Sequence, residues 1–192
     1  MLANQLDPGK TALVLIDLQR GITTFPAEPH SAAAVIANAG QLADAFRAVG
    51  APVVLVHVAT SPDGGDRLHA QVDEPQVRPQ MPPDFAEIVA ELGPAKGDIV
   101  VTKRQWGAFY GTDLDLQLRR RGITTVVLGG IATNYGVEST ARDGYERGYQ
   151  LVLVEDAMSA RSAADHAFAC ERIFPRLGRV CGTDDVIIAL GA

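Results

Sequence analysis

The chain has 192 residues, which fits one domain, residues 1–192, with a hydrophobic core of ordinary size. Apolar residues make up 47% of the chain and charged residues 21%, as in most soluble globular proteins. The formal net charge of −6 argues against a nucleic-acid partner, which requires a basic surface, and favours a site for a small molecule.

Targeting and redox features of the sequence point to the cytoplasm. No apolar run approaches the roughly 18 residues that cross a bilayer, and the N-terminus has neither the basic nor the apolar region of a signal peptide. The two cysteines, Cys170 and Cys181, are too few for a disulfide framework and are typical of a reducing compartment. We therefore expect a cytoplasmic protein without a membrane partner.

Apolar runs of strand length alternate with amphipathic stretches along the chain. Continuous apolar runs are typical of strands buried on both faces, and we expect strands at residues 11–16, 52–58, 98–101, 125–128, 151–154 and 179–181. Helical patterns occupy about 31–49, 84–92, 112–121, 134–147, 160–174 and 183–190. This alternation predicts an α/β fold of three layers (α/β/α), with a parallel sheet, right-handed crossovers and helices on both faces.

Residues at the expected helix ends support these boundaries. Gly50, Gly122 and Gly148 each follow a helical stretch, where glycine supplies the left-handed residue that ends a helix. Thr112 and Thr183 are expected to be N-caps, because acidic residues follow each of them in the first turn.

One long irregular stretch, residues 60–83, is rich in Pro, Asp, Gly and Gln. A loop of this length inside a compact domain is usually functional or mobile. We interpret it as a cover over the site or an interface with another subunit. A tolerated surface insertion is the alternative.

Two charged residues follow expected strands directly. Asp17 ends the run of residues 12–16, and Lys103 follows residues 99–102. The carboxyl ends of parallel strands face the ligand-binding crevice of such folds, so the two side chains could pair there. A turn aspartate and a solvated lysine are the alternative interpretations. The aromatic residues after Lys103, namely Trp106, Phe109 and Tyr110, could line a small-molecule pocket or pack against a partner subunit.

The third element is the turn at residues 129–136, between an expected strand and an expected helix. Free backbone N–H groups at such a turn can hold an anion or an oxyanion. By itself the signal is weak, because every doubly wound fold has several turns of this kind. Gly136 contributes no side chain to chemistry there.

Together these elements resemble the isochorismatase-like hydrolase superfamily, also called the cysteine hydrolases, over nearly the whole chain. The matching segments are residues 12–19 (ALVLIDLQ), Lys103 with residues 109–114 (FYGTDL), residues 130–134 (GIATN) and residues 148–157. The resemblance implies a six-stranded parallel sheet in the order 3-2-1-4-5-6, with a site at its C-terminal edge.

Superfamily members with a full catalytic triad use an aspartate, a lysine and a cysteine, and Asp17 and Lys103 match the first two. In such enzymes the thiolate attacks an amide or similar carbonyl, and the aspartate acts as base and then as acid. The resemblance makes Ala132 and residue 136 the backbone donors to the oxyanion, with a cis peptide before Ala132. The cysteine position falls at Gly136, which excludes the ordinary covalent mechanism.

No other nucleophile is expected to replace the missing cysteine. Cys170 lies in a late helix, and Cys181 lies on the last strand, roughly 14 Å from Asp17 at the usual strand spacing. Ser139 and Thr140 lie one helical turn beyond Gly136, past the rim of the crevice.

We expect no metal and no cofactor. Nicotinamidase-like members of the superfamily hold a metal with an Asp-x-His motif and further histidines, whereas this chain has only His57 near the second strand. A lone histidine at a strand end is more often hydrogen-bonded than a metal ligand.

Isochorismatase also has glycine at the nucleophile position. It hydrolyses an enol ether: the aspartate protonates a methylene carbon and water attacks the resulting cation. Residues 133–135 (TNY) differ from those usual in isochorismatases, so the substrate stays open. The first hypothesis is a hydrolase of a small metabolite that uses Asp17 and Lys103. The alternative is a catalytically silent binding or assembly protein.

The candidate binding residues are drawn from the loops at the same sheet edge: Gln19, Phe25, His30, Trp106, Phe109, Ala132 and Tyr135. The superfamily commonly forms dimers to octamers, so we expect a homo-oligomer.

Overall fold

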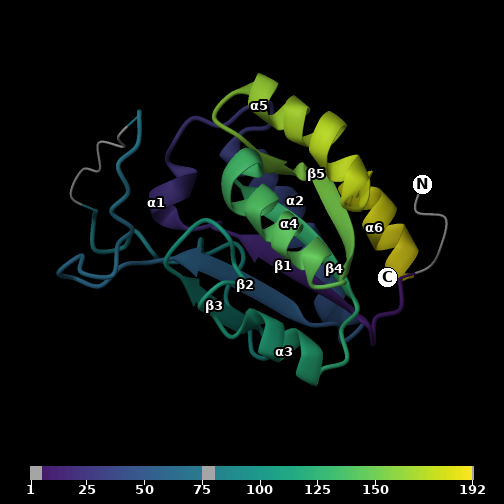
Figure 1. The fold of residues 1–192 in the computed structure, drawn as a ribbon. Coiled ribbons are helices and arrows are strands. Elements are labelled where there is room, and N and C mark those ends of the chain that lie inside the picture. Colours follow the sequence, from purple (N-terminus) through teal and green to yellow (C-terminus); the bar gives the residue numbers. More distant parts are fainter. Residues whose placement is uncertain (1–5, 75–80, 192) are drawn as a thin grey trace.

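The structure is a computed structural model that describes residues 6–74 and 81–191. Six parallel strands form one sheet in the order β3-β2-β1-β4-β5-β6, which confirms the predicted fold (Figure 1). The strands are β1 (Thr11–Ile16), β2 (Val53–Val58), β3 (Ile99–Lys103), β4 (Thr125–Ile131), β5 (Gln150–Ser159) and β6 (Arg179–Cys181).

Helices cover both faces of the sheet. The α-helices are α1 (Arg20–Thr23), α2 (Ala32–Ala48), α3 (Leu114–Arg120), α4 (Glu138–Glu146), α5 (Ala163–Phe168) and α6 (Thr183–Leu190). Two π-helical segments, η1 (Thr133–Val137) and η2 (Ala169–Ile173), and a 3-10 turn, η3 (Phe174–Arg176), extend them. In Figure 1, α2 lies behind the sheet and α4 in front of it.

The alternation of side chains along β1 explains its unbroken apolar run. Leu13 and Leu15 pack on one face in the cluster that holds α2 and α6, whereas Val14 and Ile16 pack on the other face with α3 and α4. Because successive strand residues point to opposite faces, a strand covered on both sides needs apolar residues at every position. All six β1 residues are buried.

The chain crosses the sheet next to β1, at the point where the site forms. It runs from β1 to β2 and β3 on one side and then returns to β4 on the other side. Connections that leave neighbouring strands in opposite directions open a crevice at the carboxyl ends, where ligands bind in such folds. Asp17 follows β1 at this crevice.

The helix predicted at residues 84–92 is wrong. The segment instead forms single turns and pairs with the residues after β1: Ile88 bridges Gln19 in antiparallel fashion, and the Val89 N–H donates to the Leu18 carbonyl. Backbone hydrogen bonds to a neighbouring segment here replace those of a helix, which local amphipathicity cannot reveal.

Other boundaries differ by several residues. β5 continues to Ser159, five residues past the predicted end, through an irregularity at which its register with β4 shifts between Leu128 and Gly130. The helix predicted at residues 160–174 therefore begins at Ala163 and not at residue 160. Gly50, Gly122 and Gly148 have φ of 71°, 68° and 82°, which confirms their left-handed role.

The two predicted N-caps are each displaced by one residue. Asp113 precedes α3 and Gly182 precedes α6. The Thr112 hydroxyl still accepts a hydrogen bond from the Leu114 N–H at 3.2 Å. Thr183 donates its N–H and its hydroxyl to the Asp156 carboxylate at 2.8 Å each, so a side chain from β5 supplies the acceptor for this helix start.

Candidate active site

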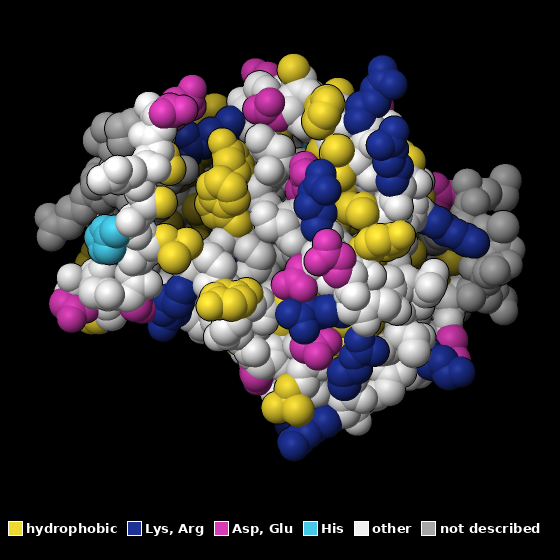
Figure 2. Space-filling view, in the orientation of Figure 1, with side chains coloured by type: hydrophobic (Ala, Val, Ile, Leu, Met, Phe, Trp, Pro, Cys, Tyr) yellow, Lys and Arg dark blue, Asp and Glu magenta, His cyan; other side chains and the backbone are white. Residues whose placement is uncertain are grey.

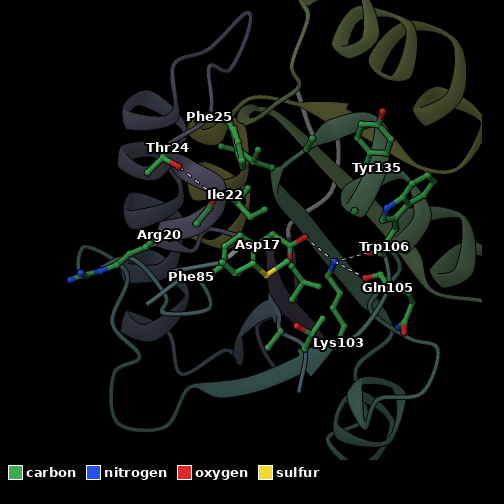
Figure 3. A pocket seen from close by; sticks show the side chains of 18 of the residues that line it. Asp17, Arg20, Ile22, Thr24, Phe25, Phe85, Lys103, Gln105, Trp106 and Tyr135 are labelled. Carbon is green, nitrogen blue, oxygen red and sulfur yellow. Dashed lines mark hydrogen bonds and ion pairs between the residues drawn. The ribbon is translucent and has the colours of Figure 1, made fainter. Parts of the chain in front are cut away.

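A cavity of about 580 Å³ opens at the carboxyl ends of the strands and contains the two charged residues singled out in the sequence (Figure 3). The strand register brings the carboxyl ends of three adjacent strands together at the bottom of the cavity: Ile16 pairs with Gly130, and Ile131 pairs with Ser159. Figure 2 shows hydrophobic side chains bordering a hollow in the part of the surface that carries α1 and the loop after β2, with Lys and Arg side chains nearby.

Asp17 and Lys103 form a buried ion pair at the bottom of this cavity. The Lys103 ammonium donates to Asp17 Oδ2 at 2.8 Å, to the Gln105 carbonyl at 3.0 Å and to the Trp106 carbonyl at 2.8 Å. An ammonium has three N–H donors, so all of them are used. Lys103 is 2% exposed, and its charge therefore acts through Asp17 and not through a free donor.

The Asp17 carboxyl combines strong burial with one unused oxygen. Burial raises its pKa to about 6, and this effect outweighs the opposing effect of Lys103, which favours the carboxylate. Oδ2 accepts from Lys103, whereas Oδ1 is buried without a hydrogen-bond partner in the described structure. The backbone at Asp17 has φ of 55°, a left-handed conformation that is uncommon outside glycine and often marks functional sites.

Gly136 lies against this pair. A β-carbon built on it would stand 3.1 Å from Asp17 Oδ2, 3.5 Å from the Trp106 carbonyl oxygen and 2.8 Å from Ile16 Cγ2. A side chain at this position would therefore sit beside the carboxylate, although Ile16 would have to move. The place that the resemblance assigns to the nucleophile is next to Asp17, and in this chain it is empty of side-chain atoms.

The turn after β4 forms one wall. Its Ile131–Ala132 peptide is cis, as the resemblance implied, and both Ala132 and Gly136 line the cavity. η1 carries Tyr135 to the rim, where its ring meets Trp106 edge to face at a centroid distance of 4.9 Å. In Figure 3 these two rings lie on one side of Asp17, and Phe25 and Phe85 lie on the other.

The long loop contributes to the opposite wall. Thr60, Leu68, Met81 and Pro82 line the cavity. The loop therefore covers part of the site, as one of the sequence interpretations proposed. Residues 75–80 of the loop lie outside the described part of the chain.

The candidate binding residues Phe109 and His30 lie away from the cavity, as does the third aromatic residue of the loop, Tyr110. Phe109 is 4% exposed and stacks on Tyr149 in the core, because the loop after Lys103 turns inward there. His30 packs edge to face against His166, and its backbone N–H donates to the Ser159 hydroxyl. Tyr110 points outward and is 75% exposed, so of the three loop aromatics only Trp106 faces the cavity.

Gln19 is fully buried below the site and does not line the cavity; its side chain instead links neighbouring backbone segments. Its side-chain amide donates to the carbonyls of Val58 and Phe85 at 3.0 and 2.9 Å, and its oxygen accepts from the Val58 N–H at 2.8 Å. These bonds join the ends of β1 and β2 to the segment that pairs with Leu18 and Gln19.

We predict that Gln19→Leu lowers the free energy of unfolding by about 2–4 kcal/mol, because buried backbone groups of Val58 and Phe85 lose their partners. Urea denaturation followed by circular dichroism measures the change. Gln41→Leu, at an exposed position of α2, is the control and should have little effect. Equal urea midpoints for the two variants would contradict this stabilising role of the Gln19 side chain.

Residues considered as a replacement nucleophile or a metal ligand have other partners. Thr140 donates to the Gly136 carbonyl, and Cys170 lies 3.5 Å from His166 Nε2. Burial raises the pKa of both Cys170 and Cys181 to about 12, which keeps them as inert thiols. His57 bonds the Ala86 carbonyl and the Thr102 hydroxyl. Within residues 6–74 and 81–191, no three His, Cys, Asp or Glu side chains cluster closely enough to hold a metal.

The sequence interpretation missed Arg161, which lines the cavity two residues after β5. A similar signal to the one that identified Asp17, a charged residue close to the carboxyl end of a strand, could have found it. Placing the end of β5 at residue 154 hid that signal. Phe85 was missed as well, because the segment around it was interpreted as a surface helix.

Comparisons with known proteins identify the family and agree with the fold. The family model described as Isochorismatase domain matches residues 11–185. The chain is 50% identical over 186 residues to the uncharacterized isochorismatase family protein YecD of Escherichia coli O157:H7, covering 97% of this chain and 99% of that protein. It is 33% identical over 176 residues to the ureidoacrylate amidohydrolase RutB of Pseudomonas syringae pv. syringae, covering 80% and 72%.

A solved structure of an isochorismatase family protein from Burkholderia thailandensis is 50% identical and superposes with a TM-score of 0.94, covering 98% of this chain and 99% of that one. In the described residues no helix combines the length and the apolar character needed to cross a membrane. The family model, the relatives and the fold agree: this chain belongs to the isochorismatase family, within the isochorismatase-like hydrolase superfamily.

Proposed function

We propose that this isochorismatase-family hydrolase cleaves a small metabolite without a covalent nucleophile, with Asp17 as the proton donor. The single observation that carries the proposal is the state of Asp17: a buried carboxyl with a pKa of about 6 and one oxygen free of hydrogen bonds, lining a cavity. A general acid must hold its proton near the working pH, and burial meets that need here.

The ion pair determines which oxygen carries the proton. Lys103 donates to Oδ2, so Oδ2 serves as an acceptor and the proton of the neutral acid resides on Oδ1. Lys103 is thus a positioning residue: it orients the carboxyl and stabilises the carboxylate that remains after the proton has left. Its three filled donors leave it no direct bond to a substrate.

The reaction best suited to this arrangement is enol-ether hydrolysis. Asp17 gives its proton to the terminal alkene carbon, which leaves an oxygen-stabilised cation. Water adds to the cation and returns a proton to Asp17, and the resulting hemiketal collapses to a ketone and an alcohol. One water is consumed, the acid is regenerated, and no bond to the protein forms.

Two further observations support hydrolysis over a purely structural role. Asp17 keeps its uncommon left-handed backbone and its pairing with Lys103 although residue 136 offers no nucleophile. A relative at 33% identity is an amidohydrolase by its name, so the scaffold supports hydrolysis in a related protein. Binding or assembly without catalysis is the competing outcome of the test.

A substrate panel tests the proposal. The wild-type protein and Asp17→Asn are incubated with small enol ethers, amides and esters, and products are identified by mass spectrometry. We expect turnover of an enol ether by the wild type that the Asn variant lacks. Absence of Asp17-dependent turnover across the panel would favour the catalytically silent alternative.

The variant Gly136→Cys tests independently whether the pocket can activate a nucleophile at residue 136. We predict that the new thiol is alkylated by iodoacetamide at pH 7, because it would lie beside the Asp17 carboxyl, which can accept its proton and is itself paired with Lys103. Overpacking against Ile16 should cost about 1–3 kcal/mol of stability.

Intact-mass spectrometry measures the alkylation, and the wild type is the control because Cys170 and Cys181 are buried. One added alkyl group in the variant, with none in the wild type at the same time point, is the expected result. An unreactive thiol in a folded variant would show that the pocket no longer activates a nucleophile.

A further inference from the structure

Among the residues that the structure describes, four cationic side chains line the cavity, and three of them already have carboxylate partners. Lys103 pairs with Asp17, Arg20 pairs with Asp84 and Glu87, and Arg104 pairs with Asp66. Arg161 forms no ion pair with any residue of the described structure. Among the described cations at the cavity wall, Arg161 is therefore the one whose charge is available to match that of a ligand.

Arg161 is held in place by its backbone and by an aromatic ring. Ala160 and Glu28 exchange two backbone hydrogen bonds of 2.9 Å, which fasten the end of β5 to the loop that carries Phe25. The Arg161 guanidinium lies 4.8 Å from the centre of the Phe25 ring, a cation–π contact. This contact restrains the guanidinium on one side and leaves its N–H groups available for an anion.

The cavity around Arg161 is mostly apolar. Phe25, Phe85, Trp106 and Tyr135 supply aromatic surface, and Ile22, Leu68 and Met81 supply aliphatic surface. An apolar wall with one unpaired arginine is complementary to a small ligand with one negative charge and an apolar, preferably planar, body.

We propose that Arg161, in cation–π contact with Phe25, binds the carboxylate of the ligand and makes this protein selective for small apolar monocarboxylates. The inference rests on the proposed function insofar as the ligand is also the substrate of Asp17. A guanidinium matches a carboxylate with two parallel N–H···O bonds, which an uncharged amide cannot reproduce.

The sheet register sets the size of such a ligand. Asp17 follows Ile16, which pairs with Gly130, and Ile131 pairs with Ser159, so Asp17 and Ser159 lie two strand spacings apart. That separation is roughly 10 Å between backbones. A carboxylate at Arg161 and a reactive group at Asp17 thus belong to one compact molecule that passes the turn at Ala132.

Benzoate and benzamide provide a matched pair of probes, equal in shape and different in charge. Binding is followed at pH 7.5 and constant ionic strength through the fluorescence of Trp106, the single tryptophan, and by calorimetry. We expect benzoate to bind at least tenfold more tightly than benzamide. Absence of saturable benzoate binding by both methods would overturn the proposal.

Variants assign the preference to Arg161. Arg161→Gln should weaken the binding of benzoate at least tenfold and leave the affinity for benzamide within twofold of that of the wild type. Arg176→Gln removes the same charge from an exposed residue near the start of β6, at the opposite edge of the sheet, and should change neither ligand. An unchanged benzoate preference in Arg161→Gln would overturn the proposal.

Asp17→Asn separates this proposal from the proposed function. That variant should keep the preference for benzoate while losing turnover. If it keeps both, the catalytic role of Asp17 fails and the carboxylate site stands. If Arg161→Gln keeps the benzoate preference while turnover still depends on Asp17, the carboxylate site fails and the catalytic role stands.

Discussion

Asp17→Asn is expected to lower kcat/KM for the enol-ether substrate by about 10²- to 10⁴-fold, the usual contribution of a positioned general acid. The asparagine keeps the shape of the side chain and an oxygen that accepts from Lys103, but it has no proton to give. Single-substrate kinetics under subsaturating conditions measure the change, and circular dichroism verifies that the variant folds. A loss below tenfold would contradict a role for Asp17 in the chemical step.

The pH profile distinguishes acid from base. Because burial raises the pKa of Asp17 to about 6, the proton donor is present below that pH and declines tenfold per unit above it. kcat/KM of the wild type should therefore fall as pH rises through about 6. A rise through the same range would mean that the ionised carboxylate is the active form and that Asp17 works as a base.

The pKa can be measured without any substrate. The folded protein holds the Asp17 proton up to about pH 6, whereas the unfolded chain releases it near the ordinary value of 3.8. The stability that protonated Asp17 contributes is thus fully present below 3.8 and is lost as pH rises through 6. Between these values the melting temperature of the wild type should fall relative to that of Asp17→Asn.

The site residues that come directly after an uninterrupted apolar stretch of a strand were predictable from the sequence. Residues 12–16 and 99–102 are each followed directly by a charged residue, and the parallel topology then brings Asp17 and Lys103 to one edge. The empty position at Gly136 could be inferred only by resemblance, because no periodicity distinguishes it from other turn glycines.

Residues whose role depends on tertiary pairing were not predictable. β5 passes through Glu155 and Asp156 with a shifted register, so charge at these positions seemed to end the strand and hid Arg161. Phe109 looked like a pocket residue because it lies between Trp106 and Tyr110 in the sequence. Whether each of the three points inward depends on packing of the loop against Tyr149, which no local pattern encodes.

Lys103→Met is expected to be the most destabilising single substitution at the site, costing about 3–5 kcal/mol of unfolding free energy at pH 7.5. It leaves the Asp17 carboxylate buried without its counter-charge and removes the donor to the carbonyls of Gln105 and Trp106. Lys96→Met, at an exposed lysine in the turn before β3, is the matched control and should cost little.

The stability lost in Lys103→Met should become smaller as the pH falls. Without Lys103 the pKa of Asp17 rises further above its ordinary value, since the ammonium that opposed the effect of burial is gone. Asp17 is then neutral near pH 5, so the three hydrogen bonds of Lys103 are missing but no buried charge is left unpaired, and the penalty should shrink as pH falls from 8 to 5. Urea titrations at both pH values measure this difference.

The double variant Asp17→Asn/Lys103→Met tests whether the charge accounts for the penalty. It removes both members of the pair, so no buried charge is left without a partner, and we expect it to recover most of the stability lost by Lys103→Met. A double variant as unstable as Lys103→Met would assign the loss to packing of the lysine stem. Recovery would show that Lys103 stabilises the fold mainly by compensating the buried charge of Asp17. The specific role of Lys103 would then be to set the pKa of Asp17 for catalysis.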